Sequence, residues 1–135
     1  MSAADPAPLA APYVIAGPVE KGDQRGRTLG IPTANVAFAR AGEDPAEGVY
    51  AAVVATPDGI RHLAAVSIGR RPTFYDDSFE LCEAHLLDYS GDLYGHTIEI
   101  RLTHHLRGQV RFTGVDALIE QMRADCDQVR RLLSV

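Results

Sequence analysis

The chain contains little cysteine and no long run of apolar residues. Its two cysteines, Cys82 and Cys126, do not have the spacing of metal ligands. The sequence therefore predicts two reduced thiols, as are usual in cytoplasmic proteins. No apolar segment approaches the roughly 20 residues that cross a bilayer, and residues 1–8 show neither the basic nor the apolar region of a secretory signal. We expect a cytoplasmic protein without a membrane partner.

Positive charge is also scarce. The chain has 13 Lys and Arg against 18 Asp and Glu, which gives a formal net charge of −5. A nucleic-acid surface needs a broad basic patch, so this balance argues against nucleic acid as a partner. The 135 residues are 46% hydrophobic and 23% charged and contain no internal repeat, which suits one globular domain with a single core.

Strand patterns dominate from residue 12 onward. Before them, residues 1–11 are rich in Ala and Pro, and we expect them to be a disordered tail or a linker. Short apolar segments separated by turn signals predict six strands, at residues 12–19, 35–39, 48–56, 60–68, 80–89 and 96–103. The clearest hairpin signal is Pro57-Asp58-Gly59.

The end of the chain changes to the period of a helix. Apolar residues follow helical spacing from Val115 to Leu133, and Thr113 with Asp116 resembles a capping box at the helix start. Short strands followed by one amphipathic helix predict a mainly β fold, a small antiparallel barrel with the helix packed on its outside. We expect residues 12–135 to form this domain.

The most informative segment is the loop at residues 22–35. It contains three glycines, Gly22, Gly26 and Gly30. Glycines let the backbone approach a ligand closely, so that successive amides can face an anion. Arg25 and Arg27 add cationic groups beside them. The order is neither a Walker loop nor a dinucleotide fingerprint, so composition alone leaves a plain loop and a phosphate cradle both open.

Thr33 and Asn35 end this loop with a hydroxyl and a carboxamide two residues apart. Oxygen ligands of this kind suit a hard cation such as Mg²⁺. The plain alternative is that the Pro-Thr-Ala-Asn segment is only a turn. Taken with the glycines and arginines, the segment predicts a cradle for phosphate and magnesium.

Glu83 is the second candidate, in the predicted strand at residues 80–89. Alternation places Glu83 on one face with His85 and with Leu81 and Leu87. Apolar neighbours desolvate a carboxylate and raise its pKa, which suits a general base. The plain alternative is an edge-strand glutamate that prevents aggregation. His85 either orients that base or is a structural residue.

In their order, these residues resemble the signatures of the riboflavin kinases (flavokinases). Residues 22–35, with the tetrad Pro-Thr-Ala-Asn, match the first signature, and residues 83–95 are similar to the second. A looser match covers residues 106–112, a flap that meets the flavin in this family. The resemblance extends over roughly residues 12–133. It implies a six-stranded Greek-key barrel with an outside helix.

The resemblance also implies a function and a site. The enzyme would transfer phosphate from ATP to the riboflavin 5′-hydroxyl, giving FMN and ADP, with Mg²⁺ as cofactor and Glu83 as the base. Thr33 and Asn35 would hold the metal ion. The implied ATP-binding residues are Gly22, Gly26, Arg27, Thr33, Leu86, Asp88 and Tyr94. Asp92 is expected to be a turn residue.

In the flap, Arg107 and Phe112 match the family and are the implied flavin-binding residues. Gln109 stands where the family has glutamate, and Val110 stands at a position that is frequently polar or basic. These departures concern the details of the flap and leave its arginine and its aromatic residue in place. A surface arginine and a phenylalanine packed under the helix are the plain alternatives.

In many bacteria this kinase domain is joined to an adenylyltransferase that carries a His-x-Gly-His motif. The chain contains no such motif, so we expect it to make FMN and not FAD; whether it is a separate enzyme or a module stays open. The alternative function is a non-catalytic flavin- or nucleotide-binding module on the same barrel. The presence of Thr33, Asn35 and Glu83 argues against it, because a pure binder needs no base. We expect a monomer.

Overall fold

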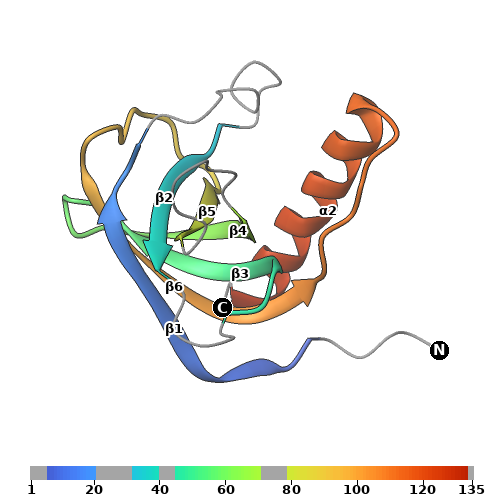
Figure 1. Cartoon of the computed structure of the whole chain (residues 1–135), viewed down its shortest axis with the longest axis horizontal. Helices are drawn as coiled ribbons and strands as arrows, with labels where there is room; N and C mark the ends of the chain where they lie inside the picture. Colours follow the sequence, from blue (N-terminus) through green and yellow to red (C-terminus); the bar gives the residue numbers. More distant parts are fainter. Residues whose placement is uncertain (1–5, 21–31, 40–44, 71–78, 134–135) are drawn as a thin grey trace.

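The computed structural model describes residues 6–20, 32–39, 45–70 and 79–133. In these residues the chain forms six strands and then one helix (Figure 1). The elements are β1 (Pro8–Pro18), β2 (Ala34–Ala39), β3 (Gly48–Ala55), β4 (Arg61–Arg70), β5 (Phe79–Leu86), β6 (Thr97–Arg107) and α2 (Val115–Leu133).

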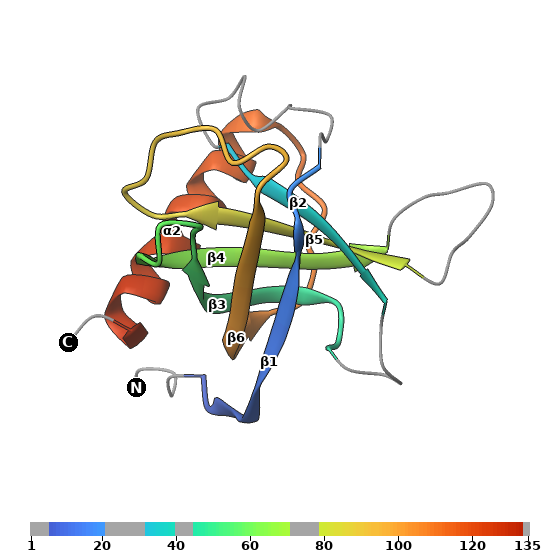
Figure 2. The ribbon, with the colours of Figure 1, turned by 90° about the vertical axis from the view of Figure 1, so that its left-hand side faces the viewer.

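The strands form one antiparallel sheet in the order β1-β6-β3-β4-β5-β2. Three consecutive strands, β3 to β5, are neighbours, and β6 returns to lie beside β3, which is a Greek-key arrangement. The sheet curls until β1 approaches β2 (Figure 2). At one end the two edges are bridged, where the Glu20 amide donates to the Asn35 carbonyl at 2.8 Å. The predicted six-stranded antiparallel barrel is confirmed in the form of a curled half-barrel.

The interior of the barrel is filled by alternate residues of the strands. Val36, Val66, Ile68, Ile100 and Leu102 are all fully buried in this core. Each such side chain contributes about 1.5–3 kcal/mol on burial. Period-two alternation predicts this for β6, in which Ile98, Ile100 and Leu102 point inward.

The hairpin between β3 and β4 lies where the sequence predicts it. The Gly59 amide donates to the Thr56 carbonyl at 2.8 Å, and the Thr56 amide donates to the Ile60 carbonyl at 3.0 Å. Gly59 has φ +83°, a left-handed conformation that glycine adopts without steric cost.

Three strand boundaries differ from the prediction by three residues or more: the start of β1, the end of β5 and the end of β6. β5 ends at Leu86 instead of continuing to residue 89, because Asp88 takes a left-handed conformation with φ 55° that breaks the strand. β1 begins at Pro8, inside the segment 1–11 that was expected to be a tail, and Pro8 pairs with His104. This longer pairing is possible because β6 itself extends to Arg107.

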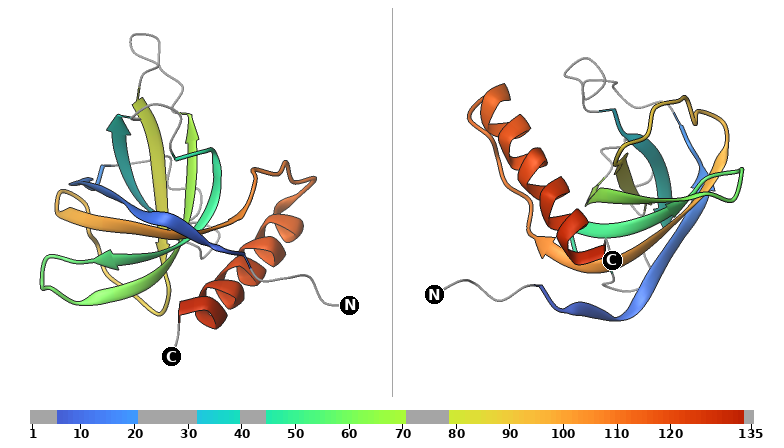
Figure 3. Two further views of the ribbon diagram at one scale, coloured as in Figure 1. Left: turned by 90° about the horizontal axis from the view of Figure 1, so that it is seen from below. Right: turned by 180° about the vertical axis from the view of Figure 1, so that it is seen from behind.

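Helix α2 packs on the outer surface of β3 and β4, as predicted (Figure 3). Its Val129 joins Ala51, Ala65 and Leu87 in a second apolar cluster. The first helical hydrogen bond runs from the Leu118 amide to the carbonyl of Gly114, the residue that caps the helix. The sequence predicted Thr113 as the capping residue, and this prediction is wrong by one position. No helix in the described residues is long and apolar enough to cross a membrane.

Both cysteines are free thiols, as predicted. Cys82 lies in the barrel core and Cys126 lies on α2 beside the second cluster. Burial raises the pKa of both thiols, because the thiolate loses its hydration in an apolar environment.

Candidate functional site

One row of residues crosses the outer face of the sheet and joins the three sequence motifs. Successive ladders pair Asn35 with Glu83, Glu83 with Ser67, Ser67 with Val49, and Val49 with Arg107. Directly opposite residues of antiparallel strands project from the same face. Asn35, Glu83 and Arg107, which are distant in sequence, therefore belong to one surface.

Asn35 and Glu83 are neighbours because of alternation within β2 and β5. Ala34 and Val36 point into the core, so Asn35 points to the outer face. Cys82 is likewise in the core, which places Glu83 outside. Asn35 is nonetheless buried, and Glu83 is half-buried. The predicted metal ligand and the predicted base thus stand side by side on two rigid strands.

A cavity of about 360 Å³ opens next to Asn35. It is lined by residues 19–20, 32–35, 86 and 89–94. These segments lie where β1 and β5 end and where β2 and β6 begin, so the cavity is at one rim of the barrel. Its volume is in the range of small-molecule sites, which is about 300–1,000 Å³. Four predicted nucleotide or metal residues line it: Thr33, Asn35, Leu86 and Tyr94.

The loop that forms one wall of the cavity is held by backbone hydrogen bonds. The Val19 amide donates to the His96 carbonyl at 2.9 Å, and the Gly95 amide donates to the Val19 carbonyl at 2.9 Å. Within the loop, the Asp92 carboxylate accepts from the Tyr94 amide at 2.9 Å. Asp92 is therefore a turn residue, as predicted, and the wall that carries Tyr94 is preformed.

His85 lies beneath the Pro-Thr-Ala-Asn segment. Its Nδ1 is 2.9 Å from the carbonyl oxygen of Pro32. A carbonyl oxygen only accepts, so Nδ1 carries the proton in this contact. The bond ties β5 to the residue before Thr33, which supports the structural interpretation of His85.

The remaining predicted nucleotide residues lie elsewhere. Asp88 does not line the cavity, and its carboxylate instead accepts from Arg130 of α2 at 3.0 Å. Gly22, Gly26 and Arg27 lie outside the described residues. Their contacts with a nucleotide stay predictions.

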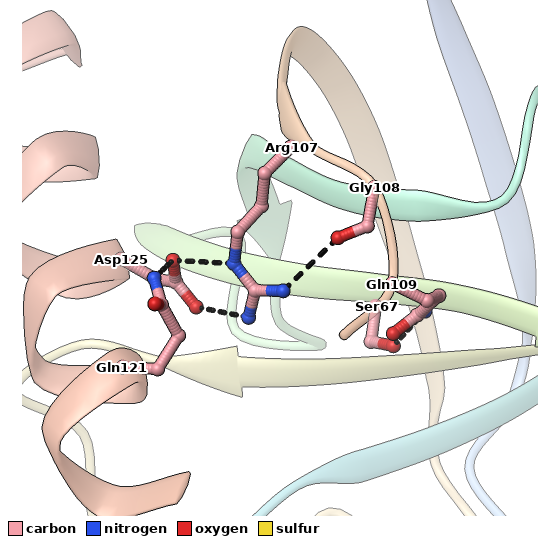
Figure 4. Close-up of polar contacts among 6 residues, drawn as sticks. All are labelled: Ser67, Arg107, Gly108, Gln109, Gln121 and Asp125. Atoms are coloured by element: carbon pink, nitrogen blue, oxygen red, sulfur yellow. Dashed lines mark hydrogen bonds and ion pairs between the residues drawn. The ribbon is translucent and has the colours of Figure 1, made fainter. Parts of the chain in front are cut away.

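Arg107 is held by the helix (Figure 4). Its Nε and Nη2 donate to the two carboxylate oxygens of Asp125 at 3.0 and 2.8 Å, and Nη1 donates to the Gly108 carbonyl at 3.0 Å. Asp125 is buried and also accepts from Gln121 at 3.0 Å. The arginine thus anchors the start of the flap to α2, and its contact with a flavin stays a prediction, as does that of Phe112.

Gln109 anchors the next part of the flap to β4. Its Nε2 donates to the Ser67 hydroxyl at 2.8 Å (Figure 4) and also to the Ile68 carbonyl at 3.0 Å. Ser67 is the cross-strand partner of Glu83, so the flap reaches the residue next to the predicted base. Val110, the other departure from the family pattern, is exposed.

Sequence analysis missed three residues of this region: Ser67, Tyr89 and Asp125. Asp125 had a usable signal, since an acidic residue on the apolar face of a helix needs a buried partner. Tyr89 is an aromatic residue inside the second matched segment. Ser67 had no local signal, because its place beside Glu83 follows from strand register alone.

The oxygen donors at the rim cavity suit one kind of metal ion. No group of three or more His, Cys, Asp and Glu in the described part of the chain could hold one. Thr33 and Asn35, whose side chains carry a hydroxyl and a carboxamide, both line the rim cavity. Mg²⁺ commonly keeps several waters and takes few protein ligands when phosphates complete its shell. The residues present therefore fit Mg²⁺ bound together with a phosphorylated ligand.

The fold and the rim cavity define a small antiparallel barrel with a preformed ligand pocket. The family model for riboflavin kinase, named Flavokinase, matches residues 9–133, and the chain belongs to this family. The bifunctional riboflavin kinase/FMN adenylyltransferase of Listeria monocytogenes is 41% identical over 125 residues, which cover 90% of this chain and 38% of that protein. The chain therefore spans well under half the length of this curated relative.

Solved structures agree on the fold. The riboflavin kinase from Trypanosoma brucei superposes with a TM-score of 0.65 at 22% identity, over 93% of this chain and 82% of that one. A macrolide-efflux protein from Streptococcus pneumoniae superposes with a TM-score of 0.78 at 35% identity, over 90% of this chain and 40% of that one.

Proposed function

We propose that this chain transfers the terminal phosphate of ATP to the 5′-hydroxyl of riboflavin, giving FMN and ADP. The observation that carries the proposal is the pairing of Glu83 with Asn35 at the edge of the rim cavity. Membership of the riboflavin kinase family and the activity for which the bifunctional relative is named support it.

ATP would occupy the rim cavity. Leu86 and Tyr94 line it, and Gly22, Gly26 and Arg27 of the preceding loop would contact the phosphates. Thr33 and Asn35 would hold Mg²⁺, which neutralises charge on the phosphate oxygens when bound. In phosphoryl transfer the protein mainly positions the reactants and stabilises charge.

Riboflavin would approach from the side of the flap and α2. Glu83 would accept the proton of the 5′-hydroxyl as that oxygen attacks the terminal phosphorus. Directly opposite residues have Cβ atoms about 4.5–5.5 Å apart, so the base is adjacent to the cation ligand Asn35. Arg107 and Phe112 at the two ends of the flap would then face the flavin.

The alternative is a binding module that has lost catalysis. Such a module gains nothing from a carboxylate next to the metal ligand, because binding alone requires no proton acceptor. The placement of Glu83 in the row with Asn35 therefore favours an enzyme.

The test is an assay with riboflavin, ATP and Mg²⁺, in which FMN is separated by chromatography. We expect equal amounts of FMN and ADP, and loss of both products when EDTA is added. Binding of riboflavin and ADP without any FMN would support the alternative module.

We also propose that the enzyme is a monomer in the cytoplasm. The described surface carries only scattered large apolar side chains, such as Val14 and Ile60. Light scattering behind size exclusion checks the mass, for which the monomer value is 14.6 kDa. A dimer mass at micromolar concentration would contradict this part of the proposal.

A further inference from the structure

The rim cavity has two kinds of lining. Two polar residues, Thr33 and Asn35, line it from one segment, and two aromatic residues, Tyr89 and Tyr94, line it from another. A nucleotide has the same division, since its phosphates are charged and its base is flat and aromatic. The tyrosine segment is thus suited to the base, with which aromatic side chains stack.

Tyr89 is supported from behind by a residue of β4. The rings of Tyr89 and His62 have centroids 4.9 Å apart and an interplanar angle of 68°, which is an edge-to-face contact. His62 does not line the cavity. It contacts a cavity residue and so acts on any ligand only through Tyr89.

His62 is in turn held by the β3–β4 hairpin. The Thr56 hydroxyl donates to the Asp58 carboxylate at 2.5 Å, and Asp58 also accepts from the Ile60 amide at 3.0 Å. Because that hydroxyl has one proton, its oxygen is left to accept from His62 Nε2, 3.4 Å away. The hydrogen bond from Thr56 lowers the pKa of Asp58, as a bond to the charged form should. The hairpin therefore orients the His62 ring.

Gly91 supports the hydroxyl end of Tyr89. A Cβ at Gly91 would lie 2.9 Å from the Tyr89 hydroxyl oxygen, and the φ of +150° also favours glycine. A larger residue at position 91 would push the tyrosine away. The ring of Tyr89 is thus contacted by His62, and the lack of a side chain at Gly91 leaves the space that its hydroxyl occupies.

We propose that His62 is a positioning residue that holds Tyr89 as the wall against which the flat base of the nucleotide lies. The proposal rests on the proposed function, because it deepens the assignment of the same cavity. It makes the β3–β4 hairpin, which belongs to neither matched signature, a part of the nucleotide site. The ligand class is a nucleoside diphosphate or triphosphate, recognised by its base as well as by its phosphates.

The test compares His62→Ala with His62→Phe, which keeps an aromatic edge. The dissociation constants of ADP and of inorganic tripolyphosphate are measured together with kcat and both KM values. We expect His62→Ala to weaken ADP binding and raise the KM for ATP by about 2- to 10-fold, the range for loss of an edge-to-face pair. Tripolyphosphate binding, kcat and the riboflavin KM should stay unchanged, and His62→Phe should restore ADP affinity.

Two further variants sharpen the result. Arg61→Ala, at an exposed neighbouring position of β4, is the matched control and should bind ADP as the wild type does. Tyr89→Leu keeps apolar bulk without a ring and tests the tyrosine wall directly, so it can still overturn the proposal if His62→Ala fails to fold. We expect it to weaken ADP binding roughly 5-fold or more, by loss of stacking, and to spare tripolyphosphate.

Unchanged ADP affinity in either His62→Ala or Tyr89→Leu would overturn the proposal, because it requires both the tyrosine wall and the support of that wall by His62. Equal weakening of ADP and tripolyphosphate would also overturn it, because it would indicate a general distortion of the cavity. Failure of the proposed function is a separate result, in which the wild type binds ADP but makes no FMN. The base-dependent difference between ADP and tripolyphosphate remains measurable in that case.

Discussion

Glu83 lies directly opposite Asn35 in the β2–β5 ladder. The first signature supplies one member of this pair and the second signature supplies the other. A shift of the register by one residue would turn Glu83 into the core and bring Cys82 or Ala84 to the outer face. Both of these neighbours are fully buried, so apolar burial holds the proposed base and the proposed metal ligand in place.

The first prediction concerns Glu83→Gln, which keeps the shape of the side chain and removes the proton acceptor. We expect kcat to fall by about 10²- to 10⁴-fold, the usual contribution of a general base. The affinity for ADP should not change. Steady-state assays and calorimetric titration check the two parts, and turnover like that of the wild type would exclude Glu83 as the base.

The second prediction concerns Thr33→Ala and Asn35→Ala. Each should raise the Mg²⁺ concentration needed for half-maximal turnover far more than it raises the riboflavin KM. The double variant should show less than the sum of the two effects, because both residues would serve one ion. Thr97→Ala removes a hydroxyl from an exposed position at the start of β6 and is the control. A wild-type Mg²⁺ requirement in both single variants would refute the metal site.

The third prediction concerns the ion pair between Arg107 and Asp125. Arg107→Ala leaves a buried carboxylate without its partner, so the free energy of unfolding should fall by about 3 kcal/mol. Replacing both residues, as Arg107→Met with Asp125→Leu, should lower the free energy of unfolding much less, because no charge is then left buried without a partner. Urea unfolding of the wild type and both variants measures this. Equal loss in the single and double variants would show that burial of a lone charge is not the cause.

The same arginine tests the flavin assignment. If Arg107 also contacts riboflavin, Arg107→Ala should raise the riboflavin KM more than the ATP KM. Asp125→Asn weakens the ion pair but keeps the guanidinium, so it should leave the riboflavin KM nearer to the wild-type value. Identical riboflavin KM values in the two variants would mean that Arg107 acts only as the anchor of the flap.

The fourth prediction follows from Cys82, whose pKa is raised by burial. Below the pKa of the unfolded chain, near 8.5, both states hold the proton and the thiol does not make stability depend on pH. Above that value the unfolded state releases the proton first, so the free energy of unfolding should fall by up to about 1.4 kcal/mol per pH unit. Urea titrations at several alkaline pH values should show that the free energy of unfolding falls less steeply with pH in Cys82→Val than in the wild type. The same dependence of unfolding free energy on pH in both proteins would show that the Cys82 thiol does not contribute to it.

Local sequence chemistry predicted much of this protein. The turn at Pro57-Asp58-Gly59, the alternation of β6 and the helical spacing after Val115 each depend on residues a few positions apart, and each is observed. The two matched motifs also named four residues that line one cavity. The turn and the two periodic patterns were predictable because turn conformation and side-chain direction are set by neighbouring residues, whereas Leu86 and Tyr94 were named by the resemblance to the family.

The contacts between distant segments were decided by the tertiary structure alone. The row from Asn35 to Arg107 depends on the register of four ladders, and the support of Tyr89 by His62 depends on two segments packing together. The partner of Arg107 lies on the helix, where Asp125 is held by its burial. Such contacts form only when the sheet curls and the helix docks. Burial of apolar surface between distant segments drives both events, and no local sequence pattern specifies them.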